Sequence, residues 1–300
     1  MRPPPYAVLA CTLACLAAAA ACRSERGASS GATRINQNAE PPRRIISLIP
    51  SATETIVALG AADRLVARTS FDVDPALAHL PSVGDGLTPS LELLTTLEPD
   101  LVVAWPDNAS RSVIGRLEDF GVRIYSPQVQ SLADLRQATE ELGDILGLEH
   151  GADSLVASID AALNAIRAAV AGLEKPGVFY VVWYDPPTTT GSGTYIDQLI
   201  EIAGGRNIFA DAPGLWPQVS MEEVVRRQPD IVLLSQTDEG PIDVEKLESA
   251  VGWRDLRAVR GGYVVQVEAD LYNRPGPRVA EAARRLATLL HPDAAGRLAQ

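Results

Sequence analysis

The chain carries one pattern twice, as SLELLTTLEPDLVV at residues 90–103 and as SMEEVVRRQPDIVL at residues 220–233. Each copy predicts a helix capped by Ser90 or Ser220, then a Pro-Asp turn, then a buried parallel strand, all at the same spacing. A capped helix before a strand is common in α/β proteins. The match alone therefore leaves open whether the two halves of the chain are related.

Outside these copies, strand-like runs continue to alternate with helical runs, which is typical of parallel sheets covered by helices. Residues 45–49 predict the first strand, followed by a helix capped by Ser51 with Glu54 three residues later. The remaining predicted strands are 101–104, 122–125, 178–183, 231–234 and 263–267, and the predicted helices of the first half include 110–120 and 131–146.

Between the halves, residues 149–175 place apolar side chains at helical spacing among many alanines. A helix of that length would span about 40 Å and form a stiff connection. The predicted fold class is α/β, with two Rossmann-like lobes (44–148 and 176–300) whose parallel sheets are joined by a single long helix. We expect closure of the lobes to be small.

The composition is that of an ordinary globular protein, and 300 residues favour two domains. The net charge of -12 and the pI near 4.8 argue against a surface for nucleic acid or anionic membrane, because such surfaces need clustered Lys and Arg.

The N-terminal segment has the form of an export signal, with Arg2 before an apolar run from Tyr6 to Ala21 that only Thr12 interrupts. A transmembrane anchor is the alternative, but this run is shorter than the roughly 20 apolar residues of a spanning helix. We therefore assign residues 1–22 to a lipoprotein signal peptide. Residues 23–43, rich in Ser, Gly, Ala, Asn and Pro, predict a flexible tether.

All three cysteines lie in this leader, at positions 11, 15 and 22, so the domain after it has no disulfide or thiol chemistry. Residues 19–22, Ala-Ala-Ala-Cys, resemble a bacterial lipobox with Cys22 as the lipidated residue. Cleavage at Cys15 is the alternative, but it would leave too short an apolar core. Acyl chains on Cys22 would hold the protein at a membrane surface.

The sequence gives little support for an enzyme. It has no Cys/His metal spacing, no Gly-x-Ser-x-Gly and no phosphate-binding Gly-Lys-Ser/Thr. His79, His150 and His291 are expected on loops or on the surface. We therefore predict no catalytic residue, no metal site and no cofactor.

Aromatic side chains are few, and several follow predicted strands, where open α/β sheets bind their ligands. Loop aromatics without a role in a core favour a binding surface for a large, flat ligand, although a structural plug is the alternative. The candidate ligand-binding aromatics are Phe71, Trp105, Tyr184 beside Trp183, Trp216 and Tyr272.

Arg274 stands in Asn-Arg-Pro-Gly-Pro-Arg, a loop stiffened by its prolines, and could donate hydrogen bonds to ligand oxygens. A surface ion pair is the alternative, and Arg278 is expected to pair within its own lobe. Glu92 and Glu222 occupy equivalent positions in the repeated pattern. The helix dipole explains acidic residues there, but the pair could also anchor a two-fold symmetric partner.

Five segments together resemble the vitamin B12-binding proteins of bacterial ABC importers, within the wider class that also binds ferric siderophores and haem. The resemblance covers about residues 44–292, and the Trp-Pro-Gln-Val-Ser segment is the one more specific to the cobalamin branch. The segments are RIISLIPSATE at 44–54, PDLV at 99–102, GGRNIF at 204–209, WPQVS at 216–220 and RPGPR at 274–278.

This resemblance implies cobalamin in a cleft between the lobes, with aromatic side chains against the corrin. It implies that Trp105, Trp216, Arg274 and, by a less certain alignment, Phe71 contact the ligand. The acidic residues that dock on permease arginines match Glu92 and Glu222.

The sequence departs from the family pattern at three positions. Gly86 stands where a close member has Trp, Thr188 where it has Phe, and Asn273 where it has an acidic residue. Thr188 nevertheless remains a candidate ligand contact.

We therefore expect an exported, membrane-anchored, monomeric binding lipoprotein that delivers cobalamin to a permease dimer with its ATPase and carries out no chemical step. A haem or ferric siderophore carrier on the same fold is the alternative, favoured if Tyr184 or Tyr272 is an iron ligand. An α/β hydrolase or reductase is the alternative from another class.

Overall fold

The computed structural model describes residues 40–105, 111–235 and 244–298 and contains two α/β lobes. The first lobe is built on a four-stranded sheet of order β2-β1-β3-β4, in which all neighbours are parallel. Its strands are β1 (Ile45–Ser47), β2 (Leu65–Ala67), β3 (Leu101–Val103) and β4 (Arg123–Tyr125). Its helices are α1 (Pro50–Ala58), α2 (Leu91–Thr96), α3 (Arg111–Asp119) and α4 (Leu132–Leu146).

Alternate residues of these strands enter two different hydrophobic clusters, one on each face of the sheet. Ile45 and Val103 pack with α1 and α4, whereas Ile46 and Val102 pack with Leu94 of α2 and with α3. Helices therefore cover both faces, as the strand–helix alternation predicts.

The second lobe contains a five-stranded sheet of order β6-β5-β8-β9, in which β7 also pairs with β5. The strands are β5 (Gly177–Tyr184), β6 (Pro187–Thr189), β7 (Arg206–Asn207), β8 (Ile231–Ser235) and β9 (Val264–Val267). All pairings are parallel except that of β6, which folds back against β5 as an antiparallel hairpin. The helices of this lobe are α6 (Tyr195–Ile202), α7 (Met221–Arg227), α8 (Val244–Ser249), α9 (Arg257–Arg260), α10 (Ala269–Tyr272), α11 (Val279–Leu290) and α12 (Ala295–Leu298).

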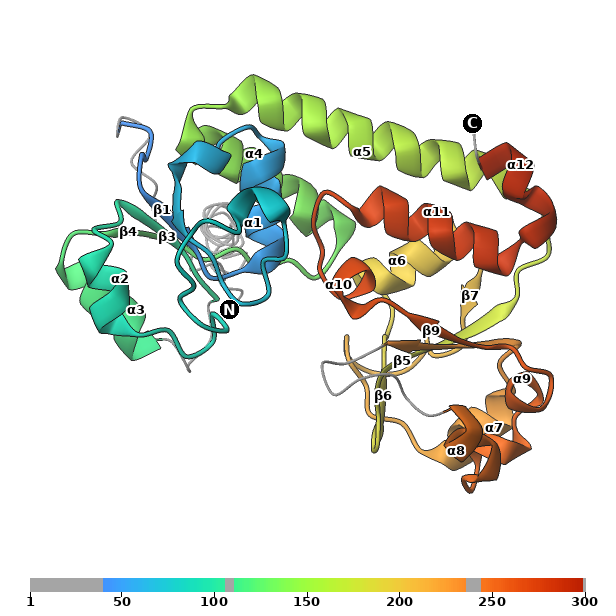
Figure 1. Cartoon of the computed structure of the whole chain (residues 1–300). Coiled ribbons are helices and arrows are strands. Elements are labelled where there is room, and N and C mark those ends of the chain that lie inside the picture. Colours follow the sequence, from blue (N-terminus) through green and yellow to red (C-terminus); the bar gives the residue numbers. More distant parts are fainter. Residues whose placement is uncertain (1–39, 106–110, 236–243, 299–300) are drawn as a thin grey trace, which may run out of the picture. The chain divides into compact units, whose positions relative to one another are not determined.

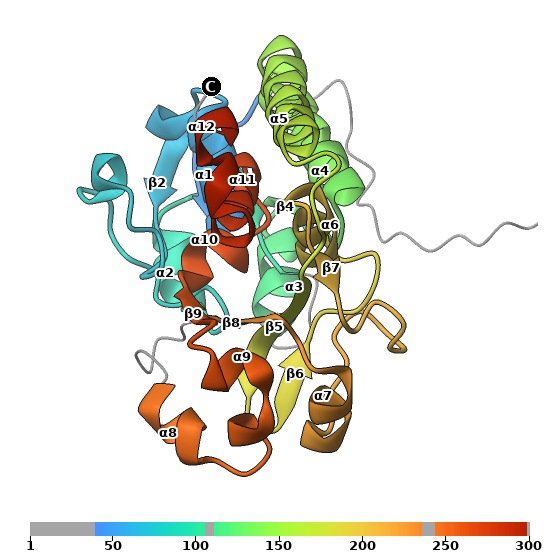
Figure 2. The ribbon, with the colours of Figure 1, turned by 90° about the vertical axis from the view of Figure 1, so that its right-hand side faces the viewer.

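The duplicated pattern forms the same structure in both lobes. The Ser90 hydroxyl accepts a hydrogen bond from Leu93 N, and the Ser220 hydroxyl accepts one from Glu223 N. Each capped helix, α2 or α7, is followed by a buried parallel strand, β3 or β8. Figure 2 shows both helices from a second direction.

Helix α5 (Glu149–Ala169) joins the lobes and contributes to the cores of both. Its Ala152 packs in the first lobe, while Leu163 and Ile166 pack in the second. It runs beside α4 and α11 (Figure 1). The helix ends before the predicted limit at residue 175, because the chain turns through Gly172 at a positive φ of 77°.

The start of α1 differs from the prediction. The helix begins at Pro50, whose fixed φ suits a first helical position, and Ile49 precedes it without a side-chain cap. Ser51 is therefore not the cap but lies buried in the first turn. Glu54 is consequently free of a capping role and contacts the second lobe.

Candidate functional site

Three predicted ligand-binding aromatics lie outside the hydrophobic cores and are partly exposed. Trp105 follows β3 and is 37% exposed, and Trp216 is 38% exposed in the segment before α7. Tyr184, at the end of β5, is 46% exposed. Side chains this large are usually better buried, so their exposure is compatible with a binding surface.

Trp105 lies next to the Arg274 loop. It lines a small cavity of about 40 Å³ together with Val129 and Pro275, among others. Pro275 follows Arg274 directly, and Val129 precedes Gln130, which contacts Trp216. Segments from both lobes thus meet around Trp105.

Arg274 reaches from the second lobe to the loop that carries Phe71. Its Nη1 donates a hydrogen bond to the Phe71 carbonyl oxygen at 3.1 Å, and its guanidinium lies 6.0 Å from the centroid of the Phe71 ring. Its Nη2 forms an ion pair at 2.5 Å with Asp270, one helical turn earlier. The charge of Arg274 is therefore balanced within the protein, and Phe71 is held beside it.

The loop around Phe71 is braced by a buried carboxylate. Asp72 accepts hydrogen bonds from Thr69 N at 2.7 Å and from Thr69 Oγ1 at 2.9 Å. Both residues are buried. The backbone that presents the Phe71 carbonyl to Arg274 is thereby fixed.

Arg278 was expected to pair within its own lobe, where its Nη2 does donate a hydrogen bond to Asp270 O at 3.1 Å, but its ion pair is with Glu54 of α1 in the first lobe. Its Nε donates to Glu54 Oε2 at 3.1 Å and its Nη2 to Glu54 Oε1 at 2.8 Å. These hydrogen bonds raise the pKa of Arg278. The ion-pair partner differs from the prediction because α1 begins earlier than the sequence indicated, which leaves Glu54 available for this contact.

Trp216 is positioned by contacts on two sides. Its Nε1 donates to Gln130 Oε1 at 3.1 Å, and its ring meets the edge of the Tyr195 ring at a centroid distance of 6.3 Å. The Trp216 segment also bonds to the backbone after β6, through Gly191 N to Leu215 O at 2.7 Å. A Cβ at Gly191 would lie 2.1 Å from Gly214 O, so only glycine allows this approach.

A buried polar network holds the loop that contains Gly191. Asp197 accepts hydrogen bonds from Gly193 N at 3.0 Å and from Asn207 Nδ2 at 2.8 Å, and Asn207 Nδ2 also reaches Thr190 O at 3.0 Å. Asp197 and Asn207 are 4% and 5% exposed. Sequence reasoning assigned no role to either residue, although Asn207 lies in the GGRNIF segment.

Thr188 lies in β6, opposite Gln218, and its hydroxyl donates to Pro186 O at 3.3 Å. The hairpin that carries Tyr184 and Thr188 therefore borders the Trp216 segment. This arrangement places Thr188 beside the Trp216 segment, while Tyr184 pairs with Pro187 on the other strand of the hairpin.

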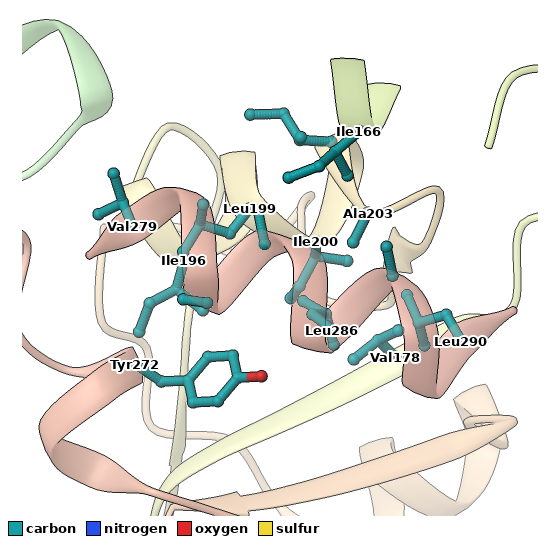
Figure 3. Close-up of a cluster of buried hydrophobic side chains, with 14 of the residues drawn as sticks. Ile166, Val178, Ile196, Leu199, Ile200, Ala203, Tyr272, Val279, Leu286 and Leu290 are labelled. Atoms are coloured by element: carbon teal, nitrogen blue, oxygen red, sulfur yellow. The ribbon is translucent and has the colours of Figure 1, made fainter. Parts of the chain in front are cut away.

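Tyr272 is not on the rim with the other aromatics. It is 4% exposed and belongs to the hydrophobic cluster of the second lobe, where Figure 3 shows its ring near Ile196. Burial raises its pKa to about 12. The expectation that its ring faces a ligand overlooked α10, whose packing turns the side chain into the core.

Two departures from the family pattern have structural reasons. Gly86 adopts a φ of 82°, and a Cβ there would lie 2.4 Å from Leu48 O, so the backbone leaves no room for a side chain. Asn273 accepts a hydrogen bond from Tyr180 at 2.7 Å and donates one to Ser235 at 2.7 Å. The Asn273 amide thus acts as both hydrogen-bond acceptor and donor, and the carboxylate beside Arg274 comes from Asp270 instead.

Glu92 and Glu222 lie exposed in the first turns of α2 and α7. Hydrogen bonds to its own backbone amide and to Ser220 lower the pKa of Glu222. No ion pair involves either carboxylate within the ranges that the structure covers. Both charges thus remain available to a partner.

His291 is buried rather than solvated, with Nε2 3.3 Å from Gly204 O, whereas His79 and His150 are exposed as expected. The described residues contain no cluster of three or more His, Cys, Asp or Glu side chains arranged to hold a metal. Among the same residues, no helix is both long and apolar enough to cross a bilayer. Cys22 lies outside the described residues.

The family model described as periplasmic binding protein matches residues 45–271, which is most of the chain and both lobes. The chain belongs to the periplasmic binding protein family. The resemblance seen in the sequence is therefore confirmed at the level of the family.

Several relatives of this periplasmic binding protein are known. An uncharacterized ABC transporter substrate-binding lipoprotein of Bacillus subtilis, YvrC, is 33% identical over 84% of this chain and 81% of its own length. The structure of the periplasmic vitamin B12 binding protein BtuF of Vibrio cholerae shares 30% identity at a TM-score of 0.68, covering 84% of this chain and 98% of its own. The apo structure of the periplasmic heme-binding protein RhuT from Roseiflexus sp. RS-1 shares 27% identity at a TM-score of 0.74, covering 84% and 99%.

Proposed function

We propose that this chain is the substrate-binding lipoprotein of an ABC importer, which captures cobalamin between its lobes as a monomer and delivers it unchanged to a membrane permease. The family and the relatives support the transport role. The ligand is proposed from the set of side chains around Arg274.

The arginine pairing is the observation that carries the ligand proposal. Haem presents two carboxylates, and a site for it needs cations that can pair with them. Arg274 is already neutralised by Asp270, and Arg278 by Glu54. A corrin ring bearing neutral amides suits such a site better, because it needs stacking surfaces and hydrogen bonds rather than free positive charge.

Aromatic side chains would supply the stacking surfaces. Trp105 and Trp216 offer partly exposed indoles, and Phe71 adds a ring held by Arg274. Each such contact with a flat ligand contributes roughly 1 to 3 kcal/mol. Tyr184 and Thr188 would contribute from the β5–β6 hairpin.

The haem alternative is favoured by one observation, the higher TM-score of the RhuT structure. Against it, Tyr272, one of the two candidate iron ligands, is buried in the hydrophobic cluster of the second lobe. A hydrolase lacks support, since no hydrogen bond joins a histidine to a Ser, Asp or Glu side chain in the described part of the chain.

Calorimetric titration of the soluble domain, begun at about Asn38, with cyanocobalamin, haemin and a ferric hydroxamate tests the ligand. Tryptophan emission provides a second readout. We expect micromolar or tighter binding of cyanocobalamin alone. Such binding by the iron compounds alone would refute the cobalamin proposal.

Trp216→Ala tests the site and should weaken cyanocobalamin binding by roughly 1 to 3 kcal/mol. Tyr263→Ala is the matched control, because Tyr263 is 59% exposed but precedes β9 and so lies at the opposite edge of the sheet. Equal affinity of the Trp216 variant and the wild type would show that this indole has only a structural role.

We further propose that Cys22 carries the lipid anchor in the cell envelope. Cys22→Ser should prevent incorporation of labelled palmitate and release the protein from membranes, whereas Cys15→Ser should leave anchoring intact. The reverse result would move the anchor to Cys15.

A further inference from the structure

Trp183 is an exposed indole at the carboxyl end of β5, next to the proposed site but not yet part of it. Its side chain is 45% exposed and belongs to none of the hydrophobic clusters of the described residues. The pairing of β5 with β8 ends at Val181 and Leu234 in this part of the chain, two residues before Trp183. A large ring therefore lies beyond the carboxyl end of a central parallel strand, where open α/β sheets bind their ligands.

The orientation of the Trp183 ring is restrained by the turn that follows it. Its Nε1 donates a hydrogen bond to Asp185 O at 2.8 Å. This N–H is the one polar hydrogen of an indole side chain, so the exposed faces of the ring are apolar. A side chain that is already restrained loses little conformational entropy when a ligand binds to it. The ring therefore suits stacking on a flat ligand better than hydrogen bonding to one.

Thr188 lies directly opposite Trp183 in the β5–β6 hairpin. Opposite residues of an antiparallel pair point to the same face of the sheet, with their Cβ atoms about 5 Å apart. Trp183 therefore shares a face with Thr188, which is already a candidate ligand contact. The Thr188 side chain is too small to cover an indole, and its hydroxyl donates to Pro186 O.

The same face of the sheet extends from Trp183 to Trp216. Thr188 pairs on its other side with Gln218, in antiparallel orientation. Backbone hydrogen bonds continue this pairing from Val219 N to Pro187 O at 2.9 Å, from Thr189 N to Pro217 O at 3.0 Å and from Gly191 N to Leu215 O at 2.7 Å. Trp216 is two residues from Gln218 in this paired segment, so both side chains point to the face of Thr188.

The two exposed indoles are therefore spaced for one large ligand. The usual spacings of strands and of residues along a strand put the backbones of Trp183 and Trp216 about 12 Å apart. Both rings are partly exposed, and each has its Nε1 bound within the protein. Two apolar rings on one face at this separation can contact different parts of a single macrocycle.

We propose that Trp183 is a further stacking residue, whose flat face contacts the ligand while Trp216 contacts another part of the same ring system. This inference rests on the proposed function and adds a residue to its site. Because the sequence departs from the family pattern at Thr188, Trp183 supplies from the opposite strand a ring that position 188 lacks.

Calorimetric titration of the soluble domain with cyanocobalamin tests the proposal. Trp183→Ala should raise the Kd about tenfold, because a stacking surface is lost. Trp183→Phe keeps an aromatic ring but lacks the Nε1 donor, and its Kd should stay within about threefold of the wild-type value. Tyr263→Ala, the control used for Trp216, should leave the Kd unchanged.

Oxidation by N-bromosuccinimide, followed by mass spectrometry of the peptides, gives a second measurement on the wild-type chain. Saturating cyanocobalamin should protect both Trp183 and Trp216 from oxidation. Trp253, which is 5% exposed, should react little with or without the ligand. Protection of Trp216 without protection of Trp183 would overturn the inference.

The outcomes separate this inference from the proposed function. If the wild type binds cyanocobalamin, an unchanged Kd for Trp183→Ala would show that the ring does not stack on the ligand. An equal rise in Kd for Trp183→Phe and Trp183→Ala would show that Trp183 only braces the turn through Nε1, which also overturns the inference. If the wild type itself does not bind cyanocobalamin, the proposed function fails.

Discussion

Gly191→Ala should displace the Trp216 segment without touching the ligand directly. The new Cβ would lie 2.1 Å from Gly214 O, while real contacts of this kind are not shorter than 3.0 Å, so the segment must move by at least about 0.9 Å. The hydrogen bond from Gly191 N to Leu215 O, now 2.7 Å, would then lengthen to about 3.6 Å and be lost.

Two losses follow from this movement. The hydrogen bond is worth about 1 kcal/mol of stability. A shift of about 1 Å in Trp216 should remove about half of a stacking contribution of roughly 2 kcal/mol, which corresponds to an approximately fivefold higher Kd. Calorimetric titration with cyanocobalamin and thermal unfolding measure the two losses separately.

Gly193→Ala is the matched control in the same loop. Gly193 has a φ of 82°, but apart from its chain neighbours no atom lies within 4 Å of the position that an added Cβ would take, so its substitution strains only the backbone. It should lower stability by about 1 kcal/mol and leave the Kd unchanged. An unchanged Kd for Gly191→Ala, or an equal rise for Gly193→Ala, would refute the reasoning.

Three further predictions concern other parts of the fold. Gly86→Trp introduces the residue that a close family member has at this position. It should lower the melting temperature and not tighten cyanocobalamin binding, because its Cβ would lie 2.4 Å from Leu48 O. A lower Kd for this variant would contradict the prediction. Arg278→Gln and Glu54→Gln should each lower the free energy of unfolding by about 0.5 to 1 kcal/mol, because each removes one partner of the ion pair. A double-mutant cycle measured by urea unfolding should show coupling between the two substitutions. Strictly additive losses would mean that the ion pair contributes nothing to stability. Burial raises the pKa of Tyr272 to about 12, so the unfolded chain loses its phenol proton at lower pH than the folded chain does. The free energy of unfolding should therefore fall as the pH rises above about 10. Tyr272→Phe should reduce this fall in urea titrations at several pH values, and an identical pH dependence in the variant would argue against the prediction.

The local signals in the sequence predicted much of the fold. The caps at Ser90, Ser131 and Ser220 and the Pro-Asp turns depend on residues near one another in the chain, and the structure has them where expected. The strands β2, β6 and β7 were missed. Strands β6 and β7 contain no apolar run, and the three apolar residues of β2 stand between Arg64 and Arg68.

Contacts between distant residues could not be predicted in the same way. The pairing of Arg278 with Glu54 depends on how two lobes meet, and the burial of Tyr272 depends on the packing of α10 against its neighbours. Neither leaves a local pattern in the sequence. The role of Gly191 was similarly hidden, because its requirement comes from a segment more than twenty residues later.

Helix α5 places Ala152 in one hydrophobic core and Ile166 in the other. Melting either lobe would strip neighbours from a helix on which the other lobe also depends, so the two lobes should denature cooperatively in one transition. A ligand bound anywhere on the folded chain would then stabilise both lobes equally against thermal unfolding, although its atoms touch only a small part of each.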